Sequence, residues 1–368
     1  MKKHYNIPIF ITHSGCKNDC VFCNQKIITG RSKSAGEEEI RRTIEEFIGI
    51  ISRIDNSSVG TEIAFFGGSF TGLDKFEMIR FLELANEYID KYDFINGVRI
   101  STRPDYISRE IIGILLKYRV KSIELGVQSM FGEVLAACKR GHTAEDTIKA
   151  CELIKSAGIN LTGQMMLALP ESDRGKDIET AKKLVELGIN SARIYPAIVL
   201  QGTQLYTMYK QNEYAPIDLY EAVFRAKEIK KIFDSNNIKV LRMGLCSSDN
   251  ININVSGGEC IGPYHPAFGE LVESEVIYDG LAEEFAKLKT ENKNSEKIEI
   301  IIETAGANMS KIVGHGRKNI SRLRERFPEF KSIKIIEKNK INENNENNEN
   351  NSFFELFVTK KVYNIIVK

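Results

Sequence analysis

The feature that most constrains this chain is a group of three cysteines close to its beginning. Cys16, Cys20 and Cys23 form a C-x3-C-x2-C loop inside the stretch Ile9 to Gln25, IFITHSGCKNDCVFCNQ. Three thiolates so close together can bind one face of a metal centre, but a cluster used only for electron transfer takes four. The next cysteine is Cys138. The simplest interpretation is a [4Fe–4S] cluster with one iron open to a ligand from outside the protein.

A structural zinc site is the alternative for the same loop. Zinc sites usually close with four ligands, often as two short pairs of Cys or His. The sequence offers no second pair, because Cys246 and Cys260 are distant single cysteines and His13 would complete a tetrahedron only with awkward geometry. Counting ligands therefore favours the open cluster.

Composition narrows the class of protein. The 51 Lys and Arg residues against 50 Asp and Glu leave a net charge of +1 over 368 residues, so any anion-binding surface must be local. The amino-terminal MKKHYNIPIFITHSG is too polar for a signal peptide, and no apolar run is long enough to span a bilayer. Seven cysteines, an odd number, argue against a disulfide scaffold. We therefore expect a cytoplasmic protein without a membrane partner.

Short apolar runs alternate with longer amphipathic ones from Ile7 to about Leu245. The apolar runs predict strands at 7–12, 62–66, 97–101, 122–127, 159–167 and 191–196. The amphipathic runs predict helices at 37–54, 73–92, 108–118, 143–158 and 177–188. Alternating strands and helices build a parallel sheet. Six units are too few for a closed eight-stranded barrel, so we expect an α/β fold with a partial (β/α)6 barrel and active groups at the carboxyl ends of its strands.

The chain is expected to divide into three parts. Residues 1–250 would form the partial barrel, including a further helix at 217–237. Residues 251–296 would form a Gly- and Pro-rich extension packing on the barrel, with an ordered loop around VSGGECIGPYHPAFGELV. Residues 297–368 would form a small α+β module, with a disordered Asn-rich insert at 339–352.

A glycine-rich turn follows the second predicted strand and begins with Gly67, Gly68 and Ser69. Glycines at a strand end let the backbone approach a ligand closely. Taken alone, such a turn before a helix is more often only a turn. The cysteine loop behind the preceding strand favours a ligand site instead.

Polar side chains also stand at or near the ends of later strands. Ser101 ends the third predicted strand, Gln128 follows the fourth, and Arg140 follows in KRGHT. An arginine there could hold a ligand carboxylate in a bidentate pair. Gln164 lies inside the apolar fifth strand, and a buried glutamine needs partners, so it either bridges strands or faces a ligand.

With these motifs, the chain resembles a radical S-adenosylmethionine enzyme, and within that superfamily the elongator-like group. The resemblance covers roughly residues 7–275 and rests on the cysteine loop, GGSF, STRPD, ELGVQS, KRGHT, RIYP with QGTQL, LRMGL and GPYHPAFGELV. The later motifs are partly shared with oxygen-independent coproporphyrinogen oxidases. Two features differ from true elongator catalytic subunits: the gap between the first two cysteines is shorter, and no acetyl-coenzyme-A-binding pattern follows Val272.

The resemblance implies the cofactors and their contacts. A [4Fe–4S] cluster would be ligated by the three cysteines of the loop and would bind S-adenosylmethionine through its fourth iron. The contacts to S-adenosylmethionine would be Phe22 near the adenine; Gly67, Gly68 and Ser69 near the methionine amino group; and Ser101, Gln128, Arg140 and Gln164 near the nucleoside or the carboxylate. Reductive cleavage would give a 5′-deoxyadenosyl radical that abstracts a substrate hydrogen, with reduced flavodoxin or ferredoxin as electron donor. No catalytic residue is assigned.

The expected substrate is an RNA, possibly a tRNA. Gly314-His315-Gly316-Arg317 opens a basic helix near the carboxyl terminus, and such glycine-rich starts suit phosphate. The RNA-binding KH signature requires two residues between its glycines, whereas this sequence has one, and a solvated basic helix face explains the same residues. Two alternatives stay open: radical oxidation of a small molecule or tetrapyrrole, and a non-catalytic protein that binds metal or RNA.

Overall fold

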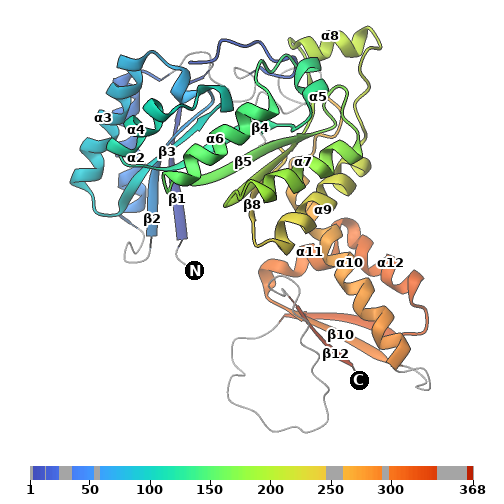
Figure 1. The fold of residues 1–368 in the computed structure, drawn as a ribbon. Helices are drawn as coiled ribbons and strands as arrows, with labels where there is room; N and C mark the ends of the chain where they lie inside the picture. Colours follow the sequence, from blue (N-terminus) through green and yellow to red (C-terminus); the bar gives the residue numbers. More distant parts are fainter. Residues whose placement is uncertain are drawn as a thin grey trace.

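The main element of the fold is a seven-stranded parallel sheet. The computed structural model describes residues 3–12, 14–24, 35–53, 59–245, 260–291, 298–337 and 363–367. The strands follow the order β1-β2-β3-β4-β5-β6-β8, and the sheet curves into a half-barrel with helices on its outer side (Figure 1). The predicted α/β fold with a partial barrel is confirmed. One strand more than the predicted six is present, because β8 (Lys239–Met243) pairs with β6.

The elements of the half-barrel lie within a few residues of the predicted ranges. Its other strands are β1 (Lys3–Phe10), β2 (Val59–Phe66), β3 (Ile95–Thr102), β4 (Val120–Gln128), β5 (Asn160–Leu167) and β6 (Ser191–Pro196). The long helices between them are α2 (Glu37–Ile51), α3 (Lys75–Lys91), α4 (Arg109–Lys117), α6 (Ala144–Ser156), α7 (Arg174–Glu186) and α9 (Leu219–Ser235). Two short helices that the sequence pattern does not predict are α5 (Gly132–Ala137) and α8 (Gln204–Lys210).

Capping side chains fix where several of these helices begin. Ser108 accepts a hydrogen bond from the Ile111 amide at 3.2 Å, and Thr143 forms a capping box with Asp146. Each cap satisfies an amide that has no partner inside the helix. Because each cap fixes the residue at which its helix begins, it also fixes where the preceding loop at the carboxyl edge of the sheet ends.

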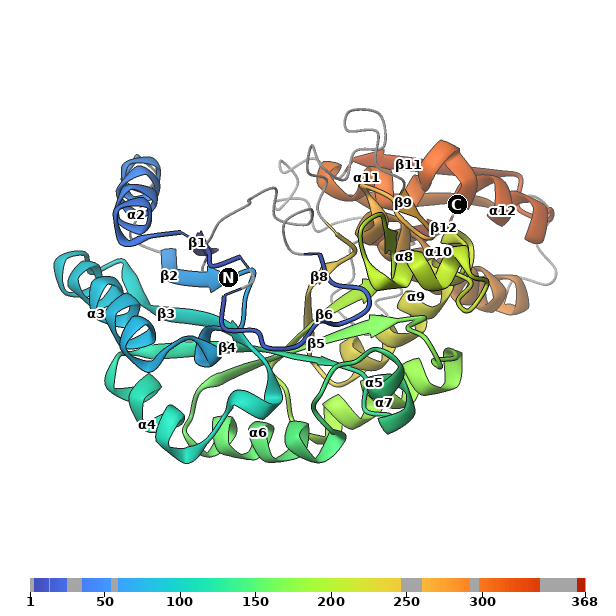
Figure 2. The ribbon, with the colours of Figure 1, turned by 90° about the horizontal axis from the view of Figure 1, so that it is seen from above.

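The two faces of the sheet differ in chemistry. On the face toward the helices, alternate residues such as Ile63, Ile100 and Leu125 are fully buried in the main hydrophobic core. On the opposite, inner face, several of the residues between them are charged. Glu62 on β2 pairs with Arg99 on β3 at 2.8 Å. Because side chains alternate across a strand, the half-barrel presents an apolar face to its helices and places charged residues on its interior face. Figure 2 shows these helices on the outer side of the curved sheet.

The remaining described chain forms a second, smaller unit. The short strand β9 (Cys260–Ile261) pairs with β7 (Val199–Leu200), and the Gly- and Pro-rich segment then becomes helical as α10 (Phe268–Glu291). A three-stranded sheet follows, with β10 (Glu299–Thr304) between β11 (Ser332–Glu337) and β12 (Tyr363–Val367). The basic stretch forms two helices, α11 (Met309–Val313) and α12 (Lys318–Arg326).

This unit has its own hydrophobic core. Leu281 and Phe285 of α10 pack with Ile300, Ile302 and Leu323 there, apart from the core of the half-barrel. The other face of α10 packs against α9, so one helix joins the two units. The predicted insert at 339–352 lies outside the described residues, and the three-part division of the chain stays a prediction. Within the described ranges, every helix is too short or too polar to cross a membrane.

Candidate metal and cofactor site

The cysteine loop lies across the carboxyl edge of the half-barrel. It leaves β1 and passes over the ends of the neighbouring strands, as the dark blue segment in Figure 2 shows. Its first contacts are with the turn after β2: the Ile11 amide donates to the Phe66 carbonyl at 2.8 Å, and the Ser69 amide donates to the Ser14 carbonyl at 3.0 Å. These hydrogen bonds place the predicted glycine-rich turn directly against the beginning of the loop.

Glycines make this close approach possible. A Cβ atom added at Gly68 would overlap the carbonyl oxygens of Ile11 and Ser14, and one added at Gly72 would overlap the Gly15 carbonyl. Each glycine is therefore required by backbone packing alone. Contact of Gly67, Gly68 and Ser69 with a methionine amino group stays a prediction, and the structure places all three next to the cysteine loop.

A second anchor comes from the segment after α5. The Asn18 side chain donates to the Arg140 carbonyl at 2.6 Å, and the Arg103 guanidinium donates to the same oxygen. Arg103 is 2% exposed, forms a bidentate pair with Asp105, and lies over the Tyr106 ring. One carbonyl thus joins the cysteine loop to the ends of β3 and β4.

The Arg140 guanidinium connects the loop to the sheet directly. Its Nη1 lies 3.3 Å from the Sγ of Cys20, and its Nη2 donates to the Gly126 carbonyl at 2.6 Å. Cys20 is 4% exposed, whereas Cys16 and Cys23 are half-buried. This contact places a cation within hydrogen-bonding distance of a sulfur that is predicted to bind the cluster.

A third anchor holds the end of the loop. The Val21 amide donates to the Cys138 carbonyl at 3.2 Å, and the Leu205 amide donates to the Val21 carbonyl at 2.7 Å. Val21 and Phe22 pack into a small apolar cluster that includes Leu169 and Leu205. Phe22, which is predicted to lie near an adenine, therefore stands at the border of this apolar cluster.

The residues predicted to contact the nucleoside or the carboxylate of S-adenosylmethionine lie at two depths, at the carboxyl edge of the sheet and within its strands. Gln128 is at the end of β4 with a φ of 66°, and its side chain is buried with no described hydrogen-bond partner for Oε1. Ser101 and Gln164 lie lower, within β3 and β5, where both are half-buried on the inner face. The structure brings Gln128, Arg140 and Cys20 together, while Ser101 and Gln164 line the wall beneath them.

Two charged pairs on the inner face were missed by the sequence reasoning. Arg193 Nε lies 2.9 Å from Glu124 Oε2, and the Arg193 guanidinium lies over the Phe66 ring. Arg99 binds Glu62 beneath them. Burial raises the pKa of the Glu124 carboxyl, although the nearby arginines oppose this. The sequence did contain a signal for these pairs. Charged residues lie inside the predicted strands 62–66, 97–101 and 122–127, and a charge buried in a strand needs a partner of opposite charge.

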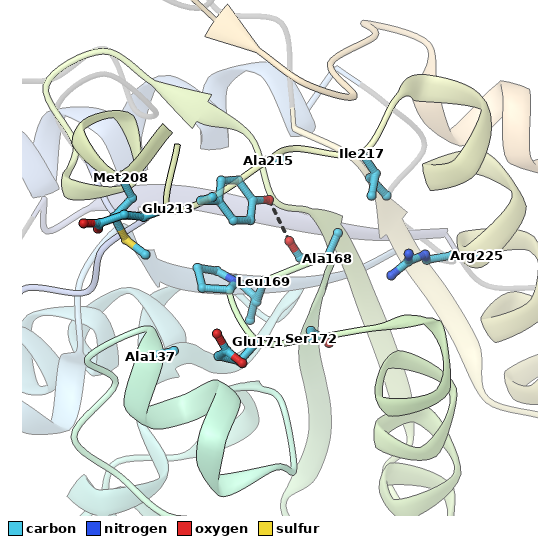
Figure 3. Close-up of a pocket in the computed structure, with 12 residues that line it drawn as sticks. Ala137, Ala168, Leu169, Glu171, Ser172, Met208, Glu213, Ala215, Ile217 and Arg225 are labelled. Atoms are coloured by element: carbon cyan, nitrogen blue, oxygen red, sulfur yellow. Dashed lines mark hydrogen bonds between the residues drawn. The ribbon is translucent and has the colours of Figure 1, made fainter. Parts of the chain in front are cut away.

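A separate cavity of about 210 Å³ lies beside the end of β5. It is bordered by Leu169, Met208 and Arg225, and the Tyr214 hydroxyl donates to the Ala168 carbonyl at 2.7 Å across one side (Figure 3). None of the predicted site residues lines it. The cavity and the cysteine loop therefore border the same small apolar cluster from different sides.

The residues at the carboxyl edge fit an iron–sulfur cluster with a polar organic ligand. The three predicted cysteines would supply the thiolates that such clusters require. Buried polar atoms need partners, and the Gln128 Oε1 and Arg140 Nε atoms have none among the described residues. A bound polar group at this edge would supply them. Within the described residues, no group of three His, Cys, Asp or Glu side chains could hold a single metal ion.

Comparison with known families decides the class of protein. The radical SAM superfamily model matches residues 10–185, and the model for the Radical_SAM C-terminal domain matches residues 189–277. The chain belongs to the radical SAM superfamily. It is therefore a radical SAM enzyme, whose cofactors are a [4Fe–4S] cluster and S-adenosylmethionine.

Relatives confirm the predicted resemblance to the elongator-like group. The chain is 42% identical over 127 residues to a tRNA uridine(34) acetyltransferase of Methanocaldococcus jannaschii (34% of this chain, 24% of that protein). It is 33% identical over 135 residues to human Elongator complex protein 3 (35% and 25%). An uncharacterized protein of M. jannaschii is 32% identical over 225 residues (59% and 68%). The chain thus spans about a quarter of the length of the first two proteins.

A solved structure shows the same fold. The Elp3 protein of Methanocaldococcus infernus, with an amino-terminal deletion, superposes with a TM-score of 0.61 at 23% identity. The match covers 76% of this chain and 64% of that chain.

Proposed function

We propose that this radical SAM enzyme modifies a base in an RNA, most directly in a tRNA. The observation that carries the proposal is the match of 42% identity over 127 residues to a tRNA uridine(34) acetyltransferase. That match covers a quarter of the relative, so acetyl transfer is not part of the proposal.

The proposal assigns the cysteine loop to the cluster. Cys16, Cys20 and Cys23 would ligate the cluster. Gln128 and Arg140, which lie at the same edge, would contact S-adenosylmethionine. When bound, these cofactors supply reductive cleavage of the sulfonium and abstraction of a substrate hydrogen. The protein supplies position: the anchors of the loop fix the cysteines against the sheet, and burial at Cys20 excludes water from that thiolate.

Charged and polar residues on the inner face of the half-barrel would contact the substrate. The buried pairs Glu124–Arg193 and Glu62–Arg99 lie beneath the cofactor edge, where a base entering the half-barrel would meet them. The half-buried amide of Gln164 lies at the same level, because it pairs in register with Gly126 on one side and Arg193 on the other. An amide and fixed charges can read the hydrogen-bonding edge of a base that has been taken out of its stack.

The test is RNA-dependent turnover of the anaerobically reconstituted enzyme. Total RNA from a strain lacking the gene is incubated with S-adenosylmethionine and a chemical reductant, and 5′-deoxyadenosine and modified nucleosides are measured by mass spectrometry. We expect faster formation of 5′-deoxyadenosine with RNA, and one nucleoside with a changed mass. The Cys20→Ala variant is the matched control without turnover. Equal 5′-deoxyadenosine with intact and nuclease-treated RNA, and no altered nucleoside, would refute the proposal.

A further inference from the structure

The smaller carboxy-terminal unit presents a cationic surface that the proposed chemistry does not use. It consists of His315, Gly316, Arg317 and Lys318, together with Tyr220 from the beginning of α9, and we call it the Gly314–Lys318 surface. All five residues are exposed. Lys318 Nζ lies 5.7 Å from the centre of the Tyr220 ring, so residues of both units contribute to this surface.

The unit around this surface has a definite topology. Two parallel neighbouring strands, β10 and β11, are joined through two helices, and the glycine-containing loop connects those helices. A third strand, β12, runs antiparallel to β10. In KH modules, a loop with glycines at its first and fourth positions clamps the backbone of a few unpaired nucleotides. The sequence alone argued against this arrangement, because Arg317 stands where the second glycine is required.

The structure removes that objection. Arg317 has a φ of 63° and a ψ of 19°, a left-handed conformation that glycine adopts readily and other residues seldom do. Gly314 also has a positive φ, of 76°. The loop is held from beneath by Asn319, which is 1% exposed and donates to the Ser274 carbonyl at 3.0 Å. The side chains of the loop are therefore left to solvent.

The cations of this surface have no acidic partner among the residues that the structure describes. Arg322, one turn further along α12, forms an ion pair with Glu275 at 2.7 Å. Arg317 and Lys318 form no ion pair with any residue in the described part of the chain. In a chain with a net charge of +1, adjacent unpaired cations attract a polyanion locally, and phosphates release counterions when they bind such groups.

An exposed aromatic ring adds a second feature that nucleic acids recognise. Tyr220 is 66% exposed, and its ring lies beside the Lys318 ammonium. Bases of unpaired strands stack on such rings, and the cations beside them bind the backbone. A solvated basic helix face does not require this ring, so the aromatic neighbour favours a ligand.

The surface adjoins the half-barrel. The His315 ring lies 6.3 Å from the ring of His265, in the segment between β9 and α10. Strand β9 in turn pairs with β7, just after the carboxyl end of β6. A strand bound here would therefore lie next to the entrance of the candidate site.

We propose that the Gly314–Lys318 surface binds the sugar–phosphate backbone of an unpaired RNA segment and so holds the substrate RNA beside the half-barrel. This deepens the proposed function and rests on its RNA substrate. The contact is sequence-independent, because Arg317 and Lys318 face phosphates while recognition of the base is left to the half-barrel.

The test measures RNA binding by the full-length, reconstituted protein. The probes are a fluorescein-labelled anticodon stem–loop, an unpaired oligonucleotide and a blunt duplex of equal length, followed by fluorescence anisotropy over a range of salt concentrations. The test variant is Arg317→Glu with Lys318→Glu, which keeps a side chain at the left-handed position. The matched control is Lys121→Glu with Lys287→Glu, because both lysines are exposed, form no described ion pair and lie far from the loop.

We expect the test variant to bind the stem–loop and the unpaired strand about ten-fold more weakly, and the slope of log affinity against log salt to fall by about 1.4. The control should change affinity less than about two-fold. Gly316→Asp is a second test variant: no atom lies within 4 Å of the added Cβ, and aspartate is among the residues that adopt a positive φ such as the 60° found here. It should weaken binding in the same direction. Cluster content and thermal unfolding show whether each variant has folded.

Equal weakening in test and control variants would overturn the proposal, as would wild-type protein that binds no probe or binds the duplex as tightly as the unpaired strand. The two proposals fail separately. Wild-type protein that binds unpaired RNA through this surface but alters no nucleoside refutes the proposed function and supports this inference. If the enzyme modifies RNA and the test variants bind RNA with unchanged affinity, the proposed function is supported and this inference is refuted.

Discussion

The Nη1 atom of Arg140 lies 3.3 Å from the Sγ of Cys20, while the Nη2 atom of the same guanidinium donates to the Gly126 carbonyl at 2.6 Å. One side chain thus connects a proposed cluster ligand to the end of β4. Hydrogen bonds to cluster sulfurs and nearby charge are the means by which a protein sets the reduction potential of an iron–sulfur cluster.

Replacement of Arg140 should shift the potential of the cluster. Arg140→Met removes a cation that stabilises the more negative, reduced cluster, so we expect a potential more negative by about 50 mV. Redox titration of the reconstituted protein, followed by electron paramagnetic resonance, measures this shift. Arg140→Lys keeps the charge but loses the fork that reaches both partners, so its shift should be smaller. Unchanged potentials in both variants would contradict the assigned contact.

A methyl group at Gly68 should dislodge the cysteine loop. The added Cβ would overlap backbone oxygens of Ile11 and Ser14, which cannot move without displacing the loop. Gly68→Ala should cost about 2 kcal/mol in the free energy of unfolding and lower the iron content per chain after reconstitution. Gly113→Ala is the control, because this exposed position in α4 has open space around it. It should stabilise the protein by about 0.5–1 kcal/mol. Normal iron content in Gly68→Ala would refute the packing argument.

Breaking the pair between Glu62 and Arg99 should destabilise the half-barrel. Arg99→Met removes the guanidinium from the buried Glu62 carboxylate, which should cost about 3 kcal/mol in urea unfolding. The carboxylate keeps its contacts to His4 and Ser122. The exposed pair Lys75–Glu110 provides the comparison, since Lys75→Met removes a cation at the surface. Its cost should stay below about 1 kcal/mol. Similar losses in the two variants would show that burial does not decide the energy of the inner pair.

His142 should make stability depend on pH over a defined window. Burial lowers the pKa of His142 to about 4, and Arg140 and Arg103 act in the same direction. The unfolded chain takes up the proton at about pH 6.5, so the contribution is complete above that pH and is lost as the pH falls toward 4. The total loss is about 3 kcal/mol. Urea titrations of the cluster-free protein across this window measure the free energy of unfolding at each pH. This free energy should fall less steeply with decreasing pH in His142→Gln than in the wild type.

The sequence predicts the half-barrel well, for a physical reason. Strand and helix periods are local properties, and 62–66 or 177–188 display them without reference to the rest of the chain. The helix α10 was missed because the glycines and prolines of 255–272 dominate its beginning. Its later residues Leu281, Phe285 and Leu288 do carry a helical spacing.

The site was predicted less completely, because its contacts join distant parts of the chain. That Asn18 binds the carbonyl of a residue 122 positions away follows from no local pattern. The conformation of Arg317 could not be anticipated either, since an arginine seldom adopts a left-handed backbone and only the surrounding fold imposes it. The roles of the predicted cofactor contacts remain predictions that the variants above address.

The anchors of the cysteine loop also determine when, during synthesis, a cluster can be held. The loop leaves the ribosome before its partners at Arg140, Cys138 and Leu205 are made. Domains fold as units once their long-range contacts exist. The thiols are therefore exposed while most of the half-barrel is still being translated, and insertion of iron and sulfur becomes durable only after Leu205 has emerged and joined Val21.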